Sequence, residues 1–105
     1  MKKYRVTISD EALAGVENYL NYIADDQAAP QNAVRWWNKA IDKIFSLDQL
    51  PHRYSYAPEN DFEELTIRLL IVDRGLFLYT VDEEQAVVRI LKFRHGSQLP
   101  RPLDH

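Results

Sequence analysis

The chain has 105 residues, a length that fits one small domain and leaves no room for a second folded unit. Hydrophobic residues make up 46% of the chain and charged residues 28%, the balance of a globular protein with a modest core and not of a disordered one. The formal net charge of -3 argues against a surface built throughout for nucleic acid, because neutralisation of phosphates supplies most nonspecific affinity.

The residue types do not favour a metal site or a membrane segment. The chain contains no cysteine, so a disulfide framework and a thiolate metal site are both excluded. His52 and His105 stand alone without metal-ligand spacing, and we expect neither a metal nor a cofactor. The start MKKYRVTISD has no apolar signal region, and no apolar stretch approaches 18 residues. We therefore expect a cytoplasmic protein that does not enter a membrane.

The first elements predicted are a strand and a helix. Tyr4, Val6 and Ile8 alternate with polar residues, which is typical of a strand with one buried face. Ser9 is a good N-cap for a helix that runs from residue 10 to about residue 24. The apolar stripe of this helix is predicted to consist of Leu13, Val16, Leu20 and Ile23.

A second helix is predicted to begin near Pro30 and to end before Pro51, so that the two helices form an antiparallel hairpin. Trp36 and Trp37 lie about 100° apart around such a helix, so both cannot face the core squarely. Either one of them lies at a partner surface or the apolar stripe is broad. The stripe is assigned to Ala33, Trp37, Ala40, Ile41, Ile44 and Leu47.

Three strands are predicted in the second half, over residues 64–72, 76–81 and 86–94, and the short turns between them favour antiparallel hairpins. In the first of these strands Arg68 is the single charged residue on a mostly apolar face, which we expect to be only partly covered. The order strand, helix, helix and three strands predicts an α+β fold, with the helices on one face of an antiparallel sheet and one domain over residues 1–105.

Residues 67–100 resemble the C-terminal half of the RelE/ParE superfamily of toxins from type II toxin-antitoxin modules. The shared features are Arg68 in the second strand, Gly75 in a hairpin turn, Tyr79 at the end of an aromatic-rich strand and the terminal run Arg94-His95-Gly96. The N-terminal strand and helical hairpin also fit. The resemblance implies a toxin held inactive by a cognate antitoxin, with DNA recognised mainly by the antitoxin in a joint complex.

The superfamily implies two activities, cleavage of messenger RNA on the ribosome or poisoning of DNA gyrase. RNA cleavage needs cations for the phosphorane charge and groups that move protons. Arg68 and Arg94 can grip phosphate and His95 can titrate near neutral pH, provided that Arg68 lies on the uncovered sheet face. The structural alternative is that Arg68 pairs with Glu63 or Glu83 and that His95 only ends its strand.

Two features favour the gyrase branch: the acidic net charge, and the absence of the second Arg that is common after His-Gly in the ribonuclease branch. On that reading the working surface is a protein interface, where exposed aromatic residues and Arg are the expected anchors. The candidates are Trp36, Tyr54, Tyr56, Arg94 and Arg101. The alternatives are a ribosome-dependent endoribonuclease that uses Arg68, Arg94 and His95, or a non-toxic module that only binds the antitoxin.

Overall fold

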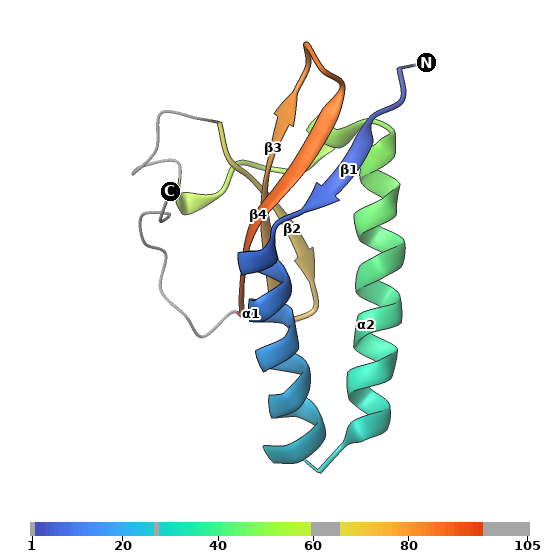
Figure 1. Ribbon diagram of the computed structural model, residues 1–105, viewed down its shortest axis with the longest axis vertical. Helices are drawn as coiled ribbons and strands as arrows, with labels where there is room; N and C mark the ends of the chain where they lie inside the picture. The colour runs from blue at the N-terminus through green and yellow to red at the C-terminus, as the bar shows by residue number, and fades with distance from the viewer. Residues whose placement is uncertain (1, 27, 60–65, 96–105) are drawn as a thin grey trace.

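The computed structural model describes residues 2–26, 28–59 and 66–95. Strand β1 (Arg5–Ile8) leads into helix α1 (Asp10–Asn21), a π-helical turn (Tyr22–Asp26) and helix α2 (Pro30–Phe45), as Figure 1 shows. Two 3-10 turns (Ser46–Asp48 and Pro51–Arg53) follow, and then strands β2 (Arg68–Val72), β3 (Gly75–Asp82) and β4 (Val87–His95). The element order and the α+β class are as the sequence predicts.

The four strands form one sheet in the order β1-β4-β3-β2. The predicted meander is confirmed, since β2 with β3 and β3 with β4 pair antiparallel. The expectation of a wholly antiparallel sheet is wrong, because β1 runs parallel to β4, with Arg5 opposite Val87 and Ile8 opposite Ile90. Parallel neighbours need a long crossover connection, and the intervening helical hairpin and meander supply it.

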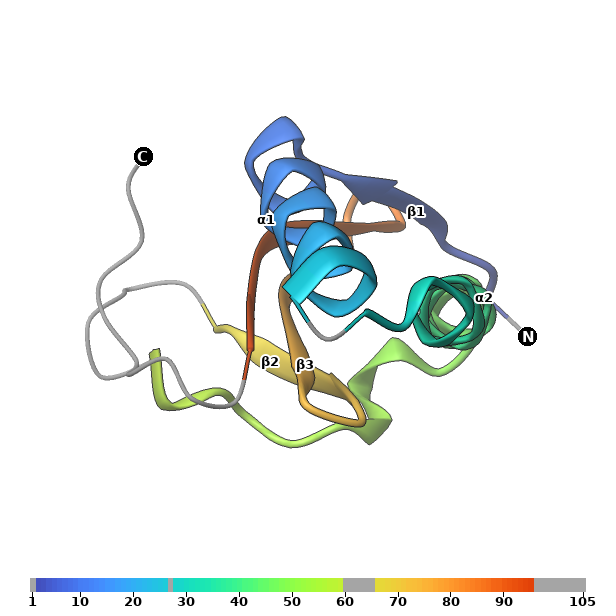
Figure 2. The ribbon, with the colours of Figure 1, turned by 90° about the horizontal axis from the view of Figure 1, so that it is seen from below.

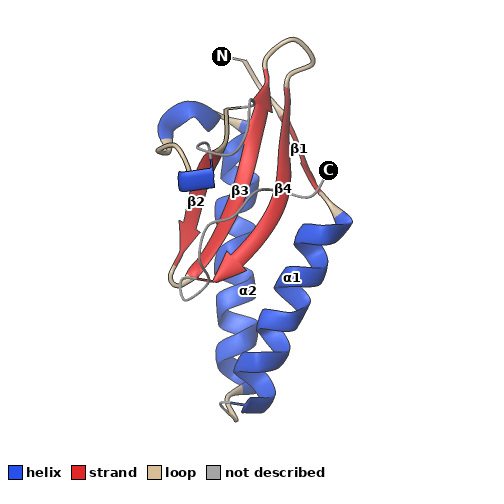
Figure 3. Ribbon diagram, turned by 90° about the vertical axis from the view of Figure 1, so that its left-hand side faces the viewer, coloured by secondary structure: helices blue, strands red, loops and turns tan. Residues whose placement is uncertain are grey.

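Both helices lie on the same side of the sheet, α1 over β4 and α2 against β2 (Figures 2 and 3). Ser9 caps α1 as predicted, since its Oγ accepts a 3.0 Å hydrogen bond from the backbone N–H of Ala12. Pro30 is the first residue of α2, also as predicted. Leu13 is a correction: it is exposed, and Ala12 joins Val16 on the buried face of α1. None of the described helices is both long enough and apolar enough to cross a membrane.

Trp36 lies in the main core between the helices and the sheet. Its ring stacks on Phe77 with centroids 6.1 Å apart, and its Nε1–H donates a 2.9 Å hydrogen bond to the carbonyl of Val72. Trp37 is half-buried and packs against the same core, so the broad apolar stripe is the arrangement found. The expectation that Trp36 is an exposed anchor is wrong, because its indole is used to join α2 to β2.

The other face of the sheet carries a smaller apolar cluster of Ala57, Ile67 and Leu78. The segment after α2 runs along the outer edge of β2, where Ala57 N–H donates to the Ile67 carbonyl and Leu69 N–H donates to the Ser55 carbonyl, each at 2.9 Å. This pairing protects a sheet edge that would otherwise be open. This face, which carries Ile67, is thus the partly covered one, whereas the sequence predicted partial cover for the face that carries Arg68.

Candidate functional site

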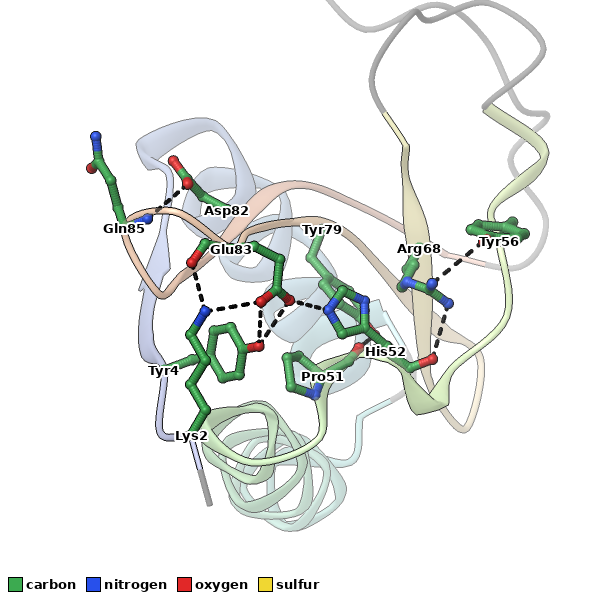
Figure 4. Close-up of polar contacts among 10 residues, drawn as sticks. All are labelled: Lys2, Tyr4, Pro51, His52, Tyr56, Arg68, Tyr79, Asp82, Glu83 and Gln85. Carbon is green, nitrogen blue, oxygen red and sulfur yellow. Dashed lines mark hydrogen bonds and ion pairs between the residues drawn. The ribbon is translucent and has the colours of Figure 1, made fainter.

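Arg68 holds the loop that follows α2. Its Nη1 donates hydrogen bonds to the carbonyl of His52 at 3.0 Å (Figure 4) and to the carbonyl of Tyr54 at 2.6 Å. Its guanidinium lies 4.5 Å from the centre of the Tyr56 ring. The expected pairing with Glu83 is wrong, because that carboxylate binds other partners, and Glu63 lies outside the described residues. Arg68 thus joins β2 to the loop.

Arg94 is neutralised inside the protein. Its Nε donates a 2.6 Å hydrogen bond to Oε2 of Glu59, and its Nη2 lies 3.4 Å from Oε1 of the same carboxylate. The exposed fraction is 8% for Arg94 and 1% for Glu59. The expectation that Arg94 is an exposed anchor is therefore wrong, since its side chain is buried and its charge pairs with Glu59, which joins β4 to the segment after α2.

His95 ends β4 and packs on α1. Its ring stacks on Tyr19 with centroids 5.8 Å apart and planes 19° from parallel, and Tyr19 stacks in turn on Tyr22. The side chain is half-buried. Its place in the structure fits the alternative that His95 completes the last strand.

The three residues proposed for RNA cleavage do not converge. Arg94 follows Phe93, which belongs to the helix-side core, so Arg94 lies on the far face of the sheet, where Glu59 meets it. Arg68 shares the helix side with Leu70, and the expectation that it lies on the uncovered face is wrong. Arg68 is paired with Tyr79 and His95 with Gly75, a separation of four residues along β3, or roughly 13 Å at the usual rise of a strand.

The aromatic candidates differ in their exposure. Tyr56 is exposed, and Tyr54 is half-buried with the guanidinium of Arg53 5.1 Å from its ring centre. Arg101 lies outside the described residues. Of the predicted set, the loop after α2 therefore carries the aromatic residues Tyr54 and Tyr56, and beside them lies Arg53, which was not predicted as a site residue.

A cluster around Glu83 was not predicted from the sequence. Glu83, in the turn between β3 and β4, accepts hydrogen bonds from Lys2 Nζ at 3.0 Å and from the Tyr4 hydroxyl at 2.8 Å, and it pairs with Nε2 of His52 (Figure 4). The contact with His52, followed by those with Lys2 and Tyr4, lowers the pKa of Glu83 to about 2. The same carboxylate raises the pKa of Lys2 and of Tyr4. The members lie about 30 to 80 positions apart, so no local pattern announces them.

Tyr79 also holds the loop after α2 in place. Its hydroxyl donates a 2.6 Å hydrogen bond to the carbonyl of Pro51, and its ring is fully buried. Burial raises the pKa of Tyr79 to about 12. The phenol thus stays protonated at neutral pH, where it serves as a hydrogen-bond donor to the loop.

Three groups therefore fix residues 50–56 against the sheet: Tyr79 at Pro51, Glu83 at His52, and Arg68 at His52 and Tyr54. The loop and the N-terminal segment border an open hollow of about 310 Å³ lined by Lys2, Tyr4, Leu50, Pro51, His52 and Arg53. Within the described ranges no group of three or more His, Cys, Asp or Glu side chains could hold a metal ion. The loop thus offers a surface with aromatic, apolar and cationic groups, which suits recognition of another macromolecule.

Comparison with known proteins places this geometry in a family. The family model of the ParE toxin of the type II toxin-antitoxin system parDE matches residues 6–100. No curated protein sequence matches the chain.

Solved structures of toxin-antitoxin systems share the fold. A chain of the chromosomal ParDE system from P. aeruginosa superposes with a TM-score of 0.69 at 13% identity, over 90% of this chain and 98% of that one. The RelBE2 complex from Mycobacterium tuberculosis gives a TM-score of 0.60 at 19% identity, over 93% and 97% of the two chains. The RelE-RelB complex from Pyrococcus horikoshii OT3 gives 0.54 at 17% identity, over 94% and 100%.

Proposed function

Since this chain belongs to the ParE toxin family of type II toxin-antitoxin systems, we propose that it arrests growth by inhibiting DNA gyrase and that a cognate antitoxin neutralises it. The proposal places the toxin in the cytoplasm, where gyrase acts. It assigns recognition of DNA to the complex with the antitoxin, because the acidic toxin has little affinity of its own for phosphates.

The observation that carries the gyrase branch is the separation of Arg68, Arg94 and His95. Internal attack on RNA needs charge stabilisation and proton transfer at a single phosphate. Arg94 is neutralised by Glu59 on one face of the sheet, and on the other face Arg68 and His95 are separated by four residues along β3. The described residues thus support an inhibitor that acts by binding better than they support a nuclease built on these three side chains.

A supercoiling assay tests the proposal. Purified toxin is added to gyrase, relaxed plasmid and ATP, and we expect loss of supercoiled product as the toxin concentration rises. A parallel reaction contains toxin that has been mixed first with its antitoxin, and here supercoiling is expected to return. Full supercoiling at excess free toxin would reject the gyrase branch.

Primer extension on translated messages tests the ribonuclease alternative in the same cells. Growth arrest without new cleavage sites in messenger RNA is the result expected of a gyrase inhibitor. Arrest with induced cleavage would instead support the ribosome-dependent endoribonuclease. A chain that is harmless when expressed alone would indicate a module that only binds the antitoxin.

A further inference from the structure

The hollow beside residues 50–53 has the size of a side-chain pocket. It lies between the segment before β1 and the loop after α2 and has a volume of about 310 Å³. A cavity of roughly 150 Å³ is enough to bind benzene, so this hollow has space for one aliphatic or aromatic side chain. The ring of Tyr4 and the side chains of Leu50 and Pro51 give it apolar walls.

Contacts within the chain hold the walls of the hollow. Glu83 holds Tyr4 and His52 through its carboxylate, and Tyr79 holds the carbonyl of Pro51 (Figure 4). A surface that is already ordered loses less conformational entropy on binding than a mobile loop does. These contacts therefore favour a hollow that is ready to recognise a partner.

Leu50 presents an apolar side chain from a strained backbone. Its φ of 51° and ψ of 52° are left-handed, a region that side chains other than Gly, Asn and Asp rarely occupy. The side chain remains 60% exposed, so burial in the core does not offset this strain. Such strained residues cluster at functional sites, where the strain fixes the geometry of a contact.

Arg53 lies at the rim of the hollow, and no carboxylate of the described residues forms an ion pair with it. Arg53 donates to the carbonyl oxygen and Oγ of Ser46, at 3.2 Å and 2.6 Å, and lies over the ring of Tyr54. All of these partners are uncharged. The nearby Glu83 carboxylate is already engaged by Lys2 and His52. An incoming carboxylate would find in Arg53 a guanidinium with its charge still available.

We propose that this hollow is where the toxin grips its protein target, taking one apolar side chain from an acidic segment whose carboxylate pairs with Arg53. The inference deepens the proposed function, because it rests on the target being a protein. The residues that dominate binding energy in interfaces cluster in well-packed pockets, and Arg is enriched among them.

The test compares Leu50→Asp and Arg53→Glu with a matched control, Val34→Asp. Val34 lies on α2 and is 61% exposed, so its change places the same charge on an equally accessible apolar residue. We expect both hollow variants to lose about tenfold or more in gyrase binding and in inhibition of supercoiling, the loss typical of an interface hot spot. Val34→Asp and Arg53→Lys are expected to keep most of the activity. Before these assays, thermal unfolding must show that each variant unfolds at the same temperature as the wild type.

Growth arrest on induction separates this inference from the choice of target. If wild-type toxin fails to inhibit gyrase, the proposed function fails. The role of the hollow in binding the target is still supported if Leu50→Asp and Arg53→Glu abolish growth arrest while Val34→Asp does not. Equal growth arrest by all variants would overturn the proposed role of the hollow, as would a wild-type chain that does not arrest growth. Variants that arrest growth but escape neutralisation would assign the hollow to the antitoxin and overturn the proposal.

Discussion

The hydroxyl of Tyr79 donates a 2.6 Å hydrogen bond to the carbonyl of Pro51, and this single contact ties the centre of the sheet to the loop that carries the candidate site. Tyr79 is paired with Arg68 on the neighbouring strand, and Arg68 binds the same loop one and three residues further on. Tyr79 on β3 and Arg68 on β2, two of the residues that carry the family resemblance, thus hold this loop in place together.

Tyr79→Phe is expected to lower the free energy of unfolding by about 1 to 2 kcal/mol, because it leaves the Pro51 carbonyl without its donor inside the protein. Urea unfolding at neutral pH measures the change. Tyr56→Phe is the control, since that hydroxyl is exposed and makes only a 3.5 Å contact with Arg68. Equal stability of Tyr79→Phe and wild type would show that the bond is not needed to hold the loop.

Glu83→Gln is expected to change how stability depends on pH. Contacts with His52, Lys2 and Tyr4 lower the pKa of Glu83 to about 2 from a usual 4.5, so the stabilisation is present above pH 4.5 and is lost as pH falls towards 2. The melting temperatures of wild type and variant should therefore differ most above pH 5 and approach each other between pH 4.5 and 2. Curves that stay parallel across this range would contradict the contacts seen around Glu83.

Arg94→Met is expected to destabilise the protein by about 3 kcal/mol or more, because it leaves the carboxylate of Glu59 buried without its cation. The double variant Glu59→Leu/Arg94→Met removes both charges and should recover a large part of this loss. Urea unfolding of the two single variants and the double variant gives the coupling energy. Strictly additive effects would show that the two charges do not interact.

Gly75→Ala is expected to cost about 1 to 3 kcal/mol through overpacking, since the new Cβ would lie 2.5 Å from Cζ2 of Trp36 and 2.9 Å from Cε1 of Phe93. Both rings are held in the core and have little room to move. Gly15→Ala is the matched control: its nearest neighbour would be the Phe93 carbonyl oxygen at 3.2 Å, and helix propensity favours Ala by about 1 kcal/mol. Thermal unfolding should show a clear loss for the first variant only.

Local patterns in the sequence were enough to predict the elements of the fold. The alternation at Tyr4, Val6 and Ile8, the N-cap Ser9 and the first-turn Pro30 each depend on neighbours within one or two turns of chain, and each predicted feature is present. The family likeness from Arg68 to His95 could also be read directly, because it consists of residue types in a fixed order.

Long-range pairing decided what the sequence alone could not. The sequence determined that there is a strand at residues 5–8, but only its position beside β4 made the sheet mixed. It placed Arg68 and Arg94 in strands and His95 at the end of one, but strand register put Arg94 on one face and set Arg68 and His95 apart on the other. It showed two adjacent tryptophans, yet the close packing over Gly75 chose Trp36 for the core. The cluster at Glu83 likewise exists only where distant segments meet, because hydrogen bonds and ion pairs act over a few ångströms in space and take no account of distance along the chain.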